Sequence, residues 1–378
     1  MYKYFNYNMF KYQIPLYKPY LNFLEKKNVY KCLKTKWISS KGEFVEKFEN
    51  KFKKLFNYKY SLTVNNGTAA LHLAVMALGI KKGDEVIVPS LTYVATANAI
   101  SYTGAKVVFV DVNLNDWQIS IESIKKNITK KTKAIVLVHL YGQPCDINPI
   151  IRLAKKKKIK VVEDCAEALG SKYHNKFVGS FGDTASFSFY GNKTITTGEG
   201  GMVVCKSKKI YQKILKLKSQ GLNLSSKKYY DHDIIGYNYR MTNICASIGL
   251  AQLSKLNFII KKKINIFKKY KKFLSKYPIK FHEQNKNTFH TFWLINILCK
   301  NFIERNKLIN FLKSKSIETR PVFIPMHKLK MYNIKKKLNN SDLISNSGIS
   351  LPSFPSLKVN EIKYISTQII NFLKKNES

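Results

Sequence analysis

Lys193 is the residue of this sequence whose setting most favours chemistry. It follows a predicted strand of small and aromatic residues and stands in Phe189-Tyr190-Gly191-Asn192-Lys193, just before a glycine-rich turn at residues 198–201. A partly desolvated lysine near another cation loses its proton more readily, and a neutral amine can form a Schiff base with a carbonyl group. The glycines would let the backbone approach a ligand closely. Lysine is abundant in this chain, so it is the setting that singles out Lys193.

Two further segments offer groups that could surround such a lysine. Asp164 ends the run Val161-Val162-Glu163-Asp164, so its carboxylate should emerge at the carboxyl edge of a sheet. There it could hold a pyridine nitrogen protonated, or it could cap a following helix. Gly67 and Thr68 lie in a polar turn between a strand and a helix, where free N–H groups and the helix dipole favour an anion. Thr68 could equally be an ordinary helix cap.

The elements that must position these residues alternate along the middle of the chain. Apolar runs predict strands at residues 60–64, 85–89, 106–110, 134–139, 160–163, 184–189 and 201–205. Helical patterns occupy residues 68–78, 93–102 and 147–157. Strands and helices at this spacing predict an α/β fold with a mostly parallel, doubly wound sheet, whose ligands bind at the carboxyl ends of the strands.

The C-terminal part of the chain has a different pattern. We expect a long helix at 243–276, a strand-like stretch at 288–298, helices at 303–314 and 361–375, and irregular chain at 320–355. A separate helix at 22–33 precedes the sheet. We predict an N-terminal extension over residues 1–12, a large domain over 13–255 and a smaller α+β domain over 256–378.

The formal net charge of +43 raises the question of nucleic-acid binding. Nearly all of the positive charge is lysine, since the only arginines are Arg152, Arg240, Arg305 and Arg320. Base readout and bidentate phosphate contacts favour arginine, and the lysines are spread along helix faces such as residues 261–272. An A+T-rich coding sequence explains the charge better, so we expect no nucleic-acid partner. The charge should still favour anionic ligands and make their binding sensitive to salt.

Several other classes of protein are disfavoured by the sequence. No apolar run approaches the roughly 18 residues of a membrane span, and residues 1–12 do not resemble a signal peptide. We therefore expect a cytoplasmic protein with no membrane partner. The six cysteines are scattered singly, which favours neither a disulfide framework nor a zinc site, and we expect no metal. The glycines at 198–201 lack the spacing of GxGxxG, and the sequence contains no GxxxxGK[ST] and no HExxH.

Six segments in order resemble the DegT/DnrJ/EryC1/StrS family of sugar aminotransferases, which are pyridoxal 5'-phosphate enzymes of fold type I. They lie at residues 37–42 (Trp-Ile-Ser-Ser-Lys-Gly), 89–93, 163–167, 191–193, 236–241 and 319–321. The resemblance runs from about Gln13 to the C-terminus. It implies a fold-type I transferase, with the mostly parallel sheet in a large domain and a smaller C-terminal α+β domain.

The resemblance also implies roles around the cofactor, pyridoxal 5'-phosphate. Lys193 would carry it as a Schiff base, and Asp164 would pair with its pyridinium nitrogen. Tyr93 would stack on the ring. The phosphate would be bound by three residues, which are Gly67, Thr68 and Ser188.

Other positions carry implications for the partner subunit and the substrate. Asn238 would reach the phosphate of the neighbouring subunit's cofactor, which implies a homodimer with shared active sites. Glu167 would lie near the cofactor's phenolic oxygen, where many family members have glutamine. Arg320 and His327 resemble the segment that approaches the sugar and diphosphate, although His327 could also be a loop histidine near a subunit interface. Either Arg320 or Arg240 could hold a carboxylate of the amino donor or a substrate phosphate.

The activity implied is a ping-pong transamination from L-glutamate to C4 of a nucleotide-linked 4-keto-6-deoxy sugar. Residues 189–202, 236–252 and 351–357 most resemble the branch that converts GDP-4-keto-6-deoxy-D-mannose to GDP-perosamine, for O-antigen biosynthesis. A UDP- or dTDP-linked keto sugar is the alternative acceptor. A related 3-dehydratase would have histidine in place of Lys193. A non-catalytic regulatory or nucleic-acid-binding protein would need none of Lys193, Asp164 and Tyr93.

Overall fold

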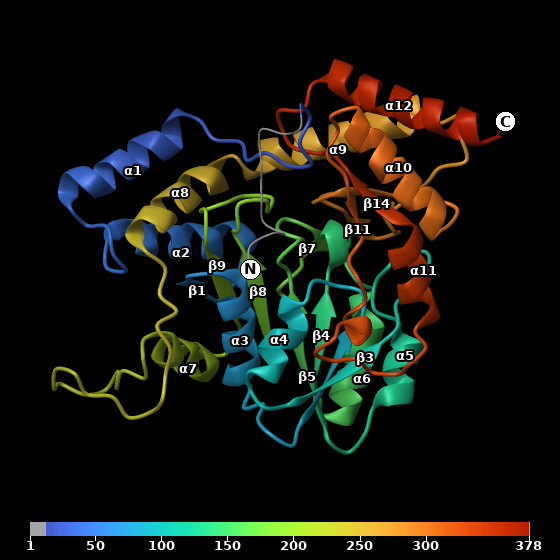
Figure 1. Cartoon of the computed structure of the whole chain (residues 1–378). Coiled ribbons are helices and arrows are strands. Elements are labelled where there is room, and N and C mark those ends of the chain that lie inside the picture. Colours follow the sequence, from blue (N-terminus) through green and yellow to red (C-terminus); the bar gives the residue numbers. More distant parts are fainter. Residues whose placement is uncertain (1–12, 378) are drawn as a thin grey trace.

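The computed structural model describes residues 13–377, so the predicted extension over residues 1–12 lies outside the described residues. The apolar runs form one seven-stranded sheet in the order β1-β9-β8-β5-β4-β2-β3 (Figure 1). Its strands are β1 (Tyr60–Val64), β2 (Glu85–Pro89), β3 (Lys106–Val110), β4 (Thr132–Val138), β5 (Lys160–Asp164), β8 (Thr184–Ser188) and β9 (Gly201–Cys205). All neighbours pair in parallel except β9, which runs antiparallel to β1 and β8. The predicted mostly parallel sheet is confirmed.

Helices cover both faces of this sheet, which is why its strands are apolar on both sides. On one face lie α3 (Gly67–Ala77), α4 (Ala95–Ser101) and α7 (Lys208–Lys218). On the other lie α2 (Glu43–Phe56), α5 (Ile121–Asn127), α6 (Ile147–Lys157) and α8 (Asn243–Ser254). The sequence prediction did not include α2, although Phe44, Phe48, Phe52 and Phe56 recur every four residues and are all buried.

A second, antiparallel sheet forms in the C-terminal part, in the order β10-β12-β14-β13. Its strands are β10 (Lys280–Phe281), β12 (Ile295–Leu298), β13 (Arg320–Pro321) and β14 (Gly348–Leu351), and it packs with α9 (Leu256–Phe273), α10 (Phe302–Ser314) and α12 (Val359–Glu377). The expected strand at 288–298 is two strands, because β11 (Thr288–Phe289) pairs instead with β6 (Lys172–Tyr173), beside β7 (Lys176–Phe177). The stretch expected to be irregular contains β13, β14 and α11 (Asn339–Ser347). These pieces are too short to show a clear periodicity.

The prediction of one long helix at 243–276 is wrong, because the structure has two helices there, α8 and α9. The chain bends by 61° between α8 and α9, at Lys255. The two halves pack in different places, since α8 lies against α1 (Phe23–Thr35) and α2, while α9 lies against α12. The break therefore comes from tertiary packing rather than from a breaker residue in the sequence.

The segment before α1 lies beside the C-terminal part of the chain. Ile14 pairs with Ile317 in a parallel bridge, and both are buried in the cluster that includes α9 and α12. The division of the chain at residue 256 stays a prediction.

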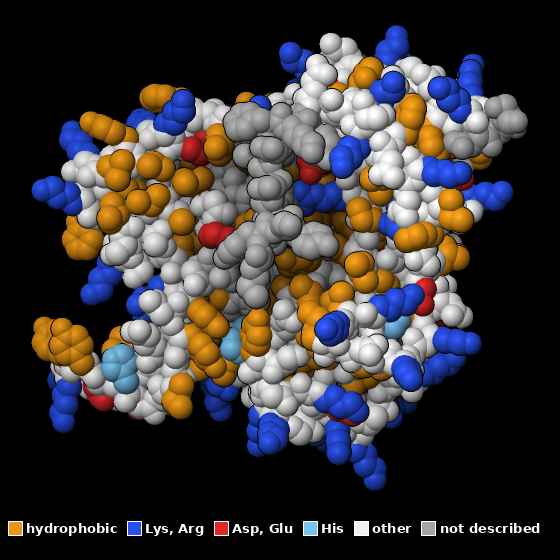
Figure 2. Space-filling view, in the orientation of Figure 1, with side chains coloured by type: hydrophobic (Ala, Val, Ile, Leu, Met, Phe, Trp, Pro, Cys, Tyr) orange, Lys and Arg blue, Asp and Glu red, His pale blue; other side chains and the backbone are white. Residues whose placement is uncertain are grey.

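No single helix within residues 13–377 has both the length and the apolar character needed to cross a membrane. The helices α8 and α9 reach that length and apolar character only when they are taken together as one bent pair. Lysine and arginine side chains are spread over much of the face shown in Figure 2, instead of forming one patch.

Candidate active site

Lys193 lies in the loop between β8 and β9, and its side chain is only 12% exposed. Its Nζ is 3.9 Å from Glu167 Oε1 and 3.9 Å from the ring centroid of Trp293. Burial lowers the pKa of Lys193, while the charges of Glu167 and Asp164 act in the opposite direction. A lysine held in this way gives up its proton more readily than a solvated one, as a nucleophilic amine must.

Asp164 is fixed at the carboxyl end of β5, where ligands of such sheets bind. Its Oδ2 accepts a hydrogen bond from Thr96 Oγ1 (2.9 Å), and its Oδ1 accepts one from the Ala166 N–H (3.1 Å). Burial raises the pKa of Asp164, and these hydrogen bonds and Lys193 oppose the rise. Turns, not a helix, follow Asp164, so the alternative role of Asp164 as a helix cap is wrong.

The polar turn after β1 leads directly into α3. Asn66 caps this helix by accepting a hydrogen bond from the Ala69 N–H (2.8 Å), so the alternative role of Thr68 as the cap is wrong. A Cβ on Gly67 would lie 2.6 Å from the Cβ of Ser188, so the two residues touch and only glycine fits. The structure thus brings Gly67 and Ser188 together beside the positive end of the α3 dipole, the arrangement that an anion requires.

Glu167 is a buried carboxyl group beside Lys193. Its Oε2 accepts a hydrogen bond from the Tyr141 N–H (2.7 Å). Burial raises the pKa of Glu167 to about 7, although Lys193 and the Tyr141 hydrogen bond lower it. A carboxyl group with this pKa can be either a proton donor or an acceptor near neutral pH.

The raised pKa predicts a pH-dependent gain in stability for Glu167→Gln in the cofactor-free protein. Below pH 4.5 the carboxyl is neutral in both the folded and the unfolded state and has no effect. As pH rises towards 7, only the unfolded state ionises, so the wild type loses stability, and above 7 the loss is complete. Glutamine still accepts from Tyr141 and does not ionise, so its advantage should be on the order of 3 kcal/mol at pH 8 and vanish near pH 4.

Urea unfolding of the cofactor-free proteins across this pH range measures the effect. Glu122→Gln is the control, because it makes the same chemical change at a largely exposed side chain. An advantage of Glu167→Gln that is the same at pH 4 and pH 8 would contradict the assigned pKa.

An aromatic wall runs from the end of β2 to Lys193. Tyr93 is 56% exposed, and its ring lies 5.8 Å from that of Phe323. Phe323 stacks on Tyr141 (5.4 Å), which in turn stacks on Trp293 (5.9 Å). The exposure of Tyr93 leaves ring surface on which a planar ligand could pack.

The remaining predicted site residues contact other parts of the chain. Asn238 is exposed and forms an isolated bridge with Ser219, in the long segment between α7 and α8. Arg240 Nε donates to Ser40 Oγ (3.3 Å).

Arg320 and His327 lie in the C-terminal part of the chain. Arg320 pairs with Glu318 (3.0 Å). His327 is buried with its Nδ1 2.7 Å from Ser90 Oγ, and burial lowers its pKa. Ser90 precedes Tyr93 by three residues, so His327 supports the loop that carries Tyr93.

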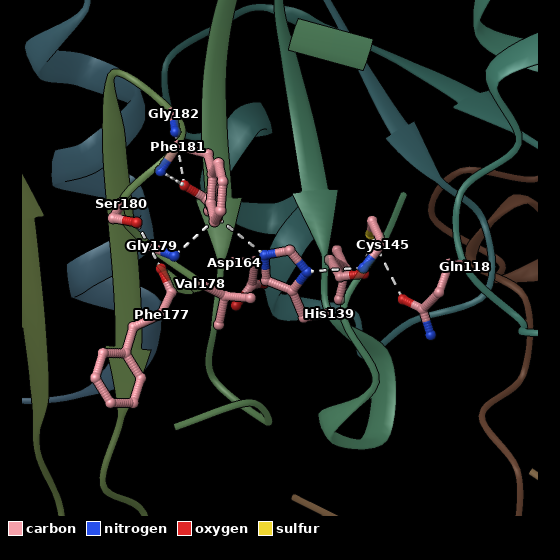
Figure 3. Close-up of polar contacts among 12 residues, drawn as sticks. Gln118, His139, Cys145, Asp164, Phe177, Val178, Gly179, Ser180, Phe181 and Gly182 are labelled. Carbon is pink, nitrogen blue, oxygen red and sulfur yellow. Dashed lines mark hydrogen bonds and ion pairs between the residues drawn. The ribbon is translucent and has the colours of Figure 1, made fainter. Parts of the chain in front are cut away.

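A buried polar cluster, drawn in Figure 3, lies directly behind Asp164. His139 Nδ1 accepts from the Cys145 N–H (3.1 Å), so its proton is on Nε2, which donates to Glu163 (3.1 Å). Glu163 also accepts three backbone N–H bonds from residues 179–182. Burial would raise the pKa of Glu163, but His139 and these N–H groups hold it below its usual range.

This cluster is the one place in residues 13–377 where His, Cys and carboxylate groups approach as metal ligands would. The ligand atoms of His139, Glu163 and Cys165 lie within 4.8 Å of one another. The imidazole and carboxylate atoms are already hydrogen-bonded, so the cluster braces the ends of β4 and β5.

Four residues of this site were not predicted from the sequence: Tyr17, Thr96, Tyr141 and Trp293. Thr96 had a local signal, because it follows Tyr93 by one helical turn and lies at the same sheet edge. Tyr141 also follows a predicted strand and has the positive φ of 56° found at functional turns. Tyr17 and Trp293 reach Lys193 only through the tertiary fold.

The model of the DegT/DnrJ/EryC1/StrS aminotransferase family matches residues 20–370, and the chain belongs to this family. It is therefore a pyridoxal 5'-phosphate-dependent sugar aminotransferase, as the sequence predicts. The GDP-perosamine synthase of Escherichia coli O157:H7 is 52% identical over 360 residues, which cover 95% of this chain and 98% of the relative. That of Vibrio cholerae is 45% identical over 364 residues, which cover 95% and 99%.

Solved structures agree with the fold. Spr1654 from Streptococcus pneumoniae in its PLP-form is 28% identical, with a TM-score of 0.91 over 96% of this chain and 99% of that one. PseC of Helicobacter pylori, an aminotransferase involved in the biosynthesis of pseudoaminic acid, is 27% identical with the same TM-score and the same coverage. Fold type I and the cofactor are both confirmed.

The residues of this site fit pyridoxal 5'-phosphate. Asn65 Oδ1 lies in the polar turn after β1, and Ser186 pairs in register with Asp164. Asn65 Oδ1 and Ser186 Oγ are buried without a hydrogen-bond partner among the described residues. Buried polar atoms of this kind are usually satisfied by a ligand or water. The contact of Gly67 with Ser188 makes the cradle that a phosphate needs.

Proposed function

We propose that this enzyme transfers the amino group of L-glutamate to C4 of GDP-4-keto-6-deoxy-D-mannose, forming GDP-perosamine and 2-oxoglutarate for O-antigen biosynthesis. The observation that supports it best is Lys193, enclosed beside Glu167 and Asp164 in a chain half identical to GDP-perosamine synthases. An amine at this position suits transamination rather than dehydration.

In this proposal each side chain has its own place at the cofactor or the donor. Bound pyridoxal 5'-phosphate supplies an electron sink for the bond broken at the donor's Cα. Lys193 would hold the cofactor covalently between turnovers. Once the amine of the donor replaces it there, its free Nζ would move the proton from the donor's Cα to the cofactor's C4′. Asp164, oriented by Thr96 and Ala166, keeps the pyridine nitrogen protonated. Tyr93 packs on the ring.

The phosphate and the phenolic oxygen have their own partners in the proposal. Gly67 and Thr68 bind the phosphate through the N-terminus of α3, and Ser188 binds it through its hydroxyl. Glu167 hydrogen-bonds the phenolic oxygen, for which its raised pKa is suited.

The substrate end and the assembly complete the proposal. Arg320 or Arg240 holds a substrate phosphate or a carboxylate of glutamate, and the buried His327 acts on the sugar-binding side through the loop that carries Tyr93. The enzyme is a cytoplasmic homodimer in which Asn238 reaches the partner's cofactor phosphate, a role open to it because its side chain is exposed. Light scattering tests the dimer, since a mass near 44 kDa instead of twice that value would exclude it.

A panel of nucleotide-linked 4-keto sugars tests the substrate. With L-glutamate as donor, release of 2-oxoglutarate should be at least about 100-fold faster, as kcat/KM, for GDP-4-keto-6-deoxymannose than for its UDP- and dTDP-linked counterparts. The reason is that a site built to hydrogen-bond guanine would keep polar groups of the enzyme unpaired when another base is bound, and this cost lowers kcat/KM. Equal rates, or preference for a UDP- or dTDP-linked sugar, would refute this substrate while leaving the transaminase chemistry intact.

A further inference from the structure

The loop that carries Lys193 is held by two aromatic side chains from distant parts of the chain. The Tyr17 hydroxyl donates to the carbonyl of Lys193 itself (2.5 Å). The Trp293 indole N–H donates to the preceding carbonyl, that of Asn192 (2.7 Å). Two consecutive carbonyls at the lysine are thus fixed by donors that lie 176 and 101 residues away in sequence.

Trp293 lies against Lys193 both at its backbone and at the end of its side chain. Its N–H fixes the backbone where the side chain begins, and its ring faces Nζ at 3.9 Å. The ring itself is buried and stacks on Tyr141. Within the loop, Lys193 N–H donates to the Tyr190 carbonyl, whereas a Cβ on Gly191 would meet open space. The loop has other hydrogen bonds of its own, such as Thr197 N–H to the Phe189 carbonyl, but the carbonyls of Asn192 and Lys193 accept theirs from Trp293 and Tyr17.

Tyr17 is itself firmly placed. The Leu16 N–H donates to Glu318 Oε2 (2.9 Å), and the Leu16 carbonyl accepts from the Ser353 N–H (3.2 Å). The fully buried Nζ of Lys263 faces the Tyr17 ring at 5.1 Å and donates to the Ser353 carbonyl (2.5 Å). Burial raises the pKa of Tyr17, so its phenol stays a hydrogen-bond donor at any working pH.

We infer that Tyr17 is a positioning residue for Lys193, and that together with Trp293 it fixes the backbone from which Nζ reaches the cofactor. The Nζ of Lys193 is confined between Glu167 and the Trp293 ring, so the side chain cannot absorb a displacement of its backbone, and the displacement is carried to the reacting nitrogen. Reaction rates fall steeply with such displacements. The inference rests on the proposed attachment of the cofactor to Lys193. It adds a role for the segment before α1, which also contacts Glu318, the partner of Arg320.

The test is Tyr17→Phe in the full-length enzyme loaded with pyridoxal 5'-phosphate. The variant removes one oxygen atom and leaves the ring. We expect the cofactor to dissociate about fivefold faster in dialysis, and kcat to fall about fivefold, the size expected for one neutral hydrogen bond. KM for the sugar nucleotide should stay within about twofold of the wild type. The pH midpoint of the visible absorption band should shift.

Tyr58→Phe is the matched control. Its hydroxyl is also buried and donates to a backbone carbonyl, that of Val178 (2.6 Å), but it does not contact the lysine loop. Both variants should lose similar thermal stability, and only Tyr17→Phe should change cofactor release and the absorption band. If the two variants behave alike in those readouts, Tyr17 is merely structural and the inference is wrong.

A second variant covers a failure of Tyr17→Phe to fold. Trp293→Phe keeps an aromatic ring near Nζ and removes the N–H, so it should also release the cofactor several-fold faster. Unchanged release would overturn the inference. Borohydride labelling of the wild type separates this outcome from failure of the proposed function: a label on another lysine refutes the proposed function, whereas a label on Lys193 with unchanged release refutes only the positioning role.

Discussion

Lys193→Ala is expected to reduce transamination by about four orders of magnitude, because in the proposed mechanism one side chain both attaches the cofactor and moves the proton. The variant should bind pyridoxal 5'-phosphate without the visible band of the lysine-bound form. Burial and the neighbouring Glu167 leave little room for another amine to replace it. The measurements are 2-oxoglutarate formation, the absorption spectrum and peptide mapping after borohydride reduction, which makes the bond between cofactor and lysine permanent.

Lys263 is a second buried lysine whose amine could react with the cofactor, so the peptide mapping must distinguish it from Lys193. It is fully buried, and burial lowers its pKa to about 7, so its amine is also available near neutral pH. It faces Tyr17 and the Ser353 carbonyl rather than a carboxylate or an anion-binding turn. A label on the peptide of Lys263, or on any lysine other than Lys193, would overturn the assignment.

Lys193→Ala can also be used to test whether the two subunits share their active sites. An Asn238→Ala protein should retain Lys193 but hold the phosphate weakly. Mixed with Lys193→Ala under conditions that exchange subunits, it should form hybrid dimers in which one site contains both native residues. Activity should then rise well above that of either variant alone. No rise, with hybrids shown by mass spectrometry, would contradict the role of Asn238 across the interface.

The local order of strands and helices could be predicted from the sequence, because it depends on patterns within a few residues. The run that forms β2 is buried throughout, the run that forms β3 is buried except at Lys106 and in part Val108, and the bounds of both match the prediction. The carboxyl ends of parallel strands meet at one edge, so the sequence alone is enough to place Asp164 and Lys193 near each other. The phenylalanine stripe of α2 was equally readable from the sequence.

What the sequence could not show depends on contacts between distant segments. The bend at Lys255 arises because α8 and α9 pack against different helices. The hydrogen bonds of Tyr17 and Trp293 to the lysine loop span more than a hundred residues, and neither aromatic residue lies in a recognisable motif. The sequence offered Thr68 as the cap of α3, whereas the structure has Asn66. Both are good cap residues, and only the backbone conformation decides between them.

Asp164→Asn is expected to lower kcat by about three orders of magnitude while the cofactor stays attached to Lys193. Asparagine has nearly the same shape and can still accept the hydrogen bond from Thr96. It has no charge, so it cannot keep the pyridine nitrogen protonated, and the electron sink is lost. The raised pKa of Asp164 reflects burial, and a protonated ring nitrogen is the cation that would stabilise its charged form there.

Thr96→Val provides the graded comparison. It leaves the Asp164 carboxylate charged and removes only one of its two hydrogen bonds, so kcat should fall by no more than about tenfold. Stopped-flow spectra of the half-reaction with glutamate separate this chemical step from cofactor binding. If Asp164→Asn retains more than about a tenth of the wild-type rate, or falls no further than Thr96→Val, then the charge of Asp164 does not drive the reaction, and its place at the end of β5 is structural.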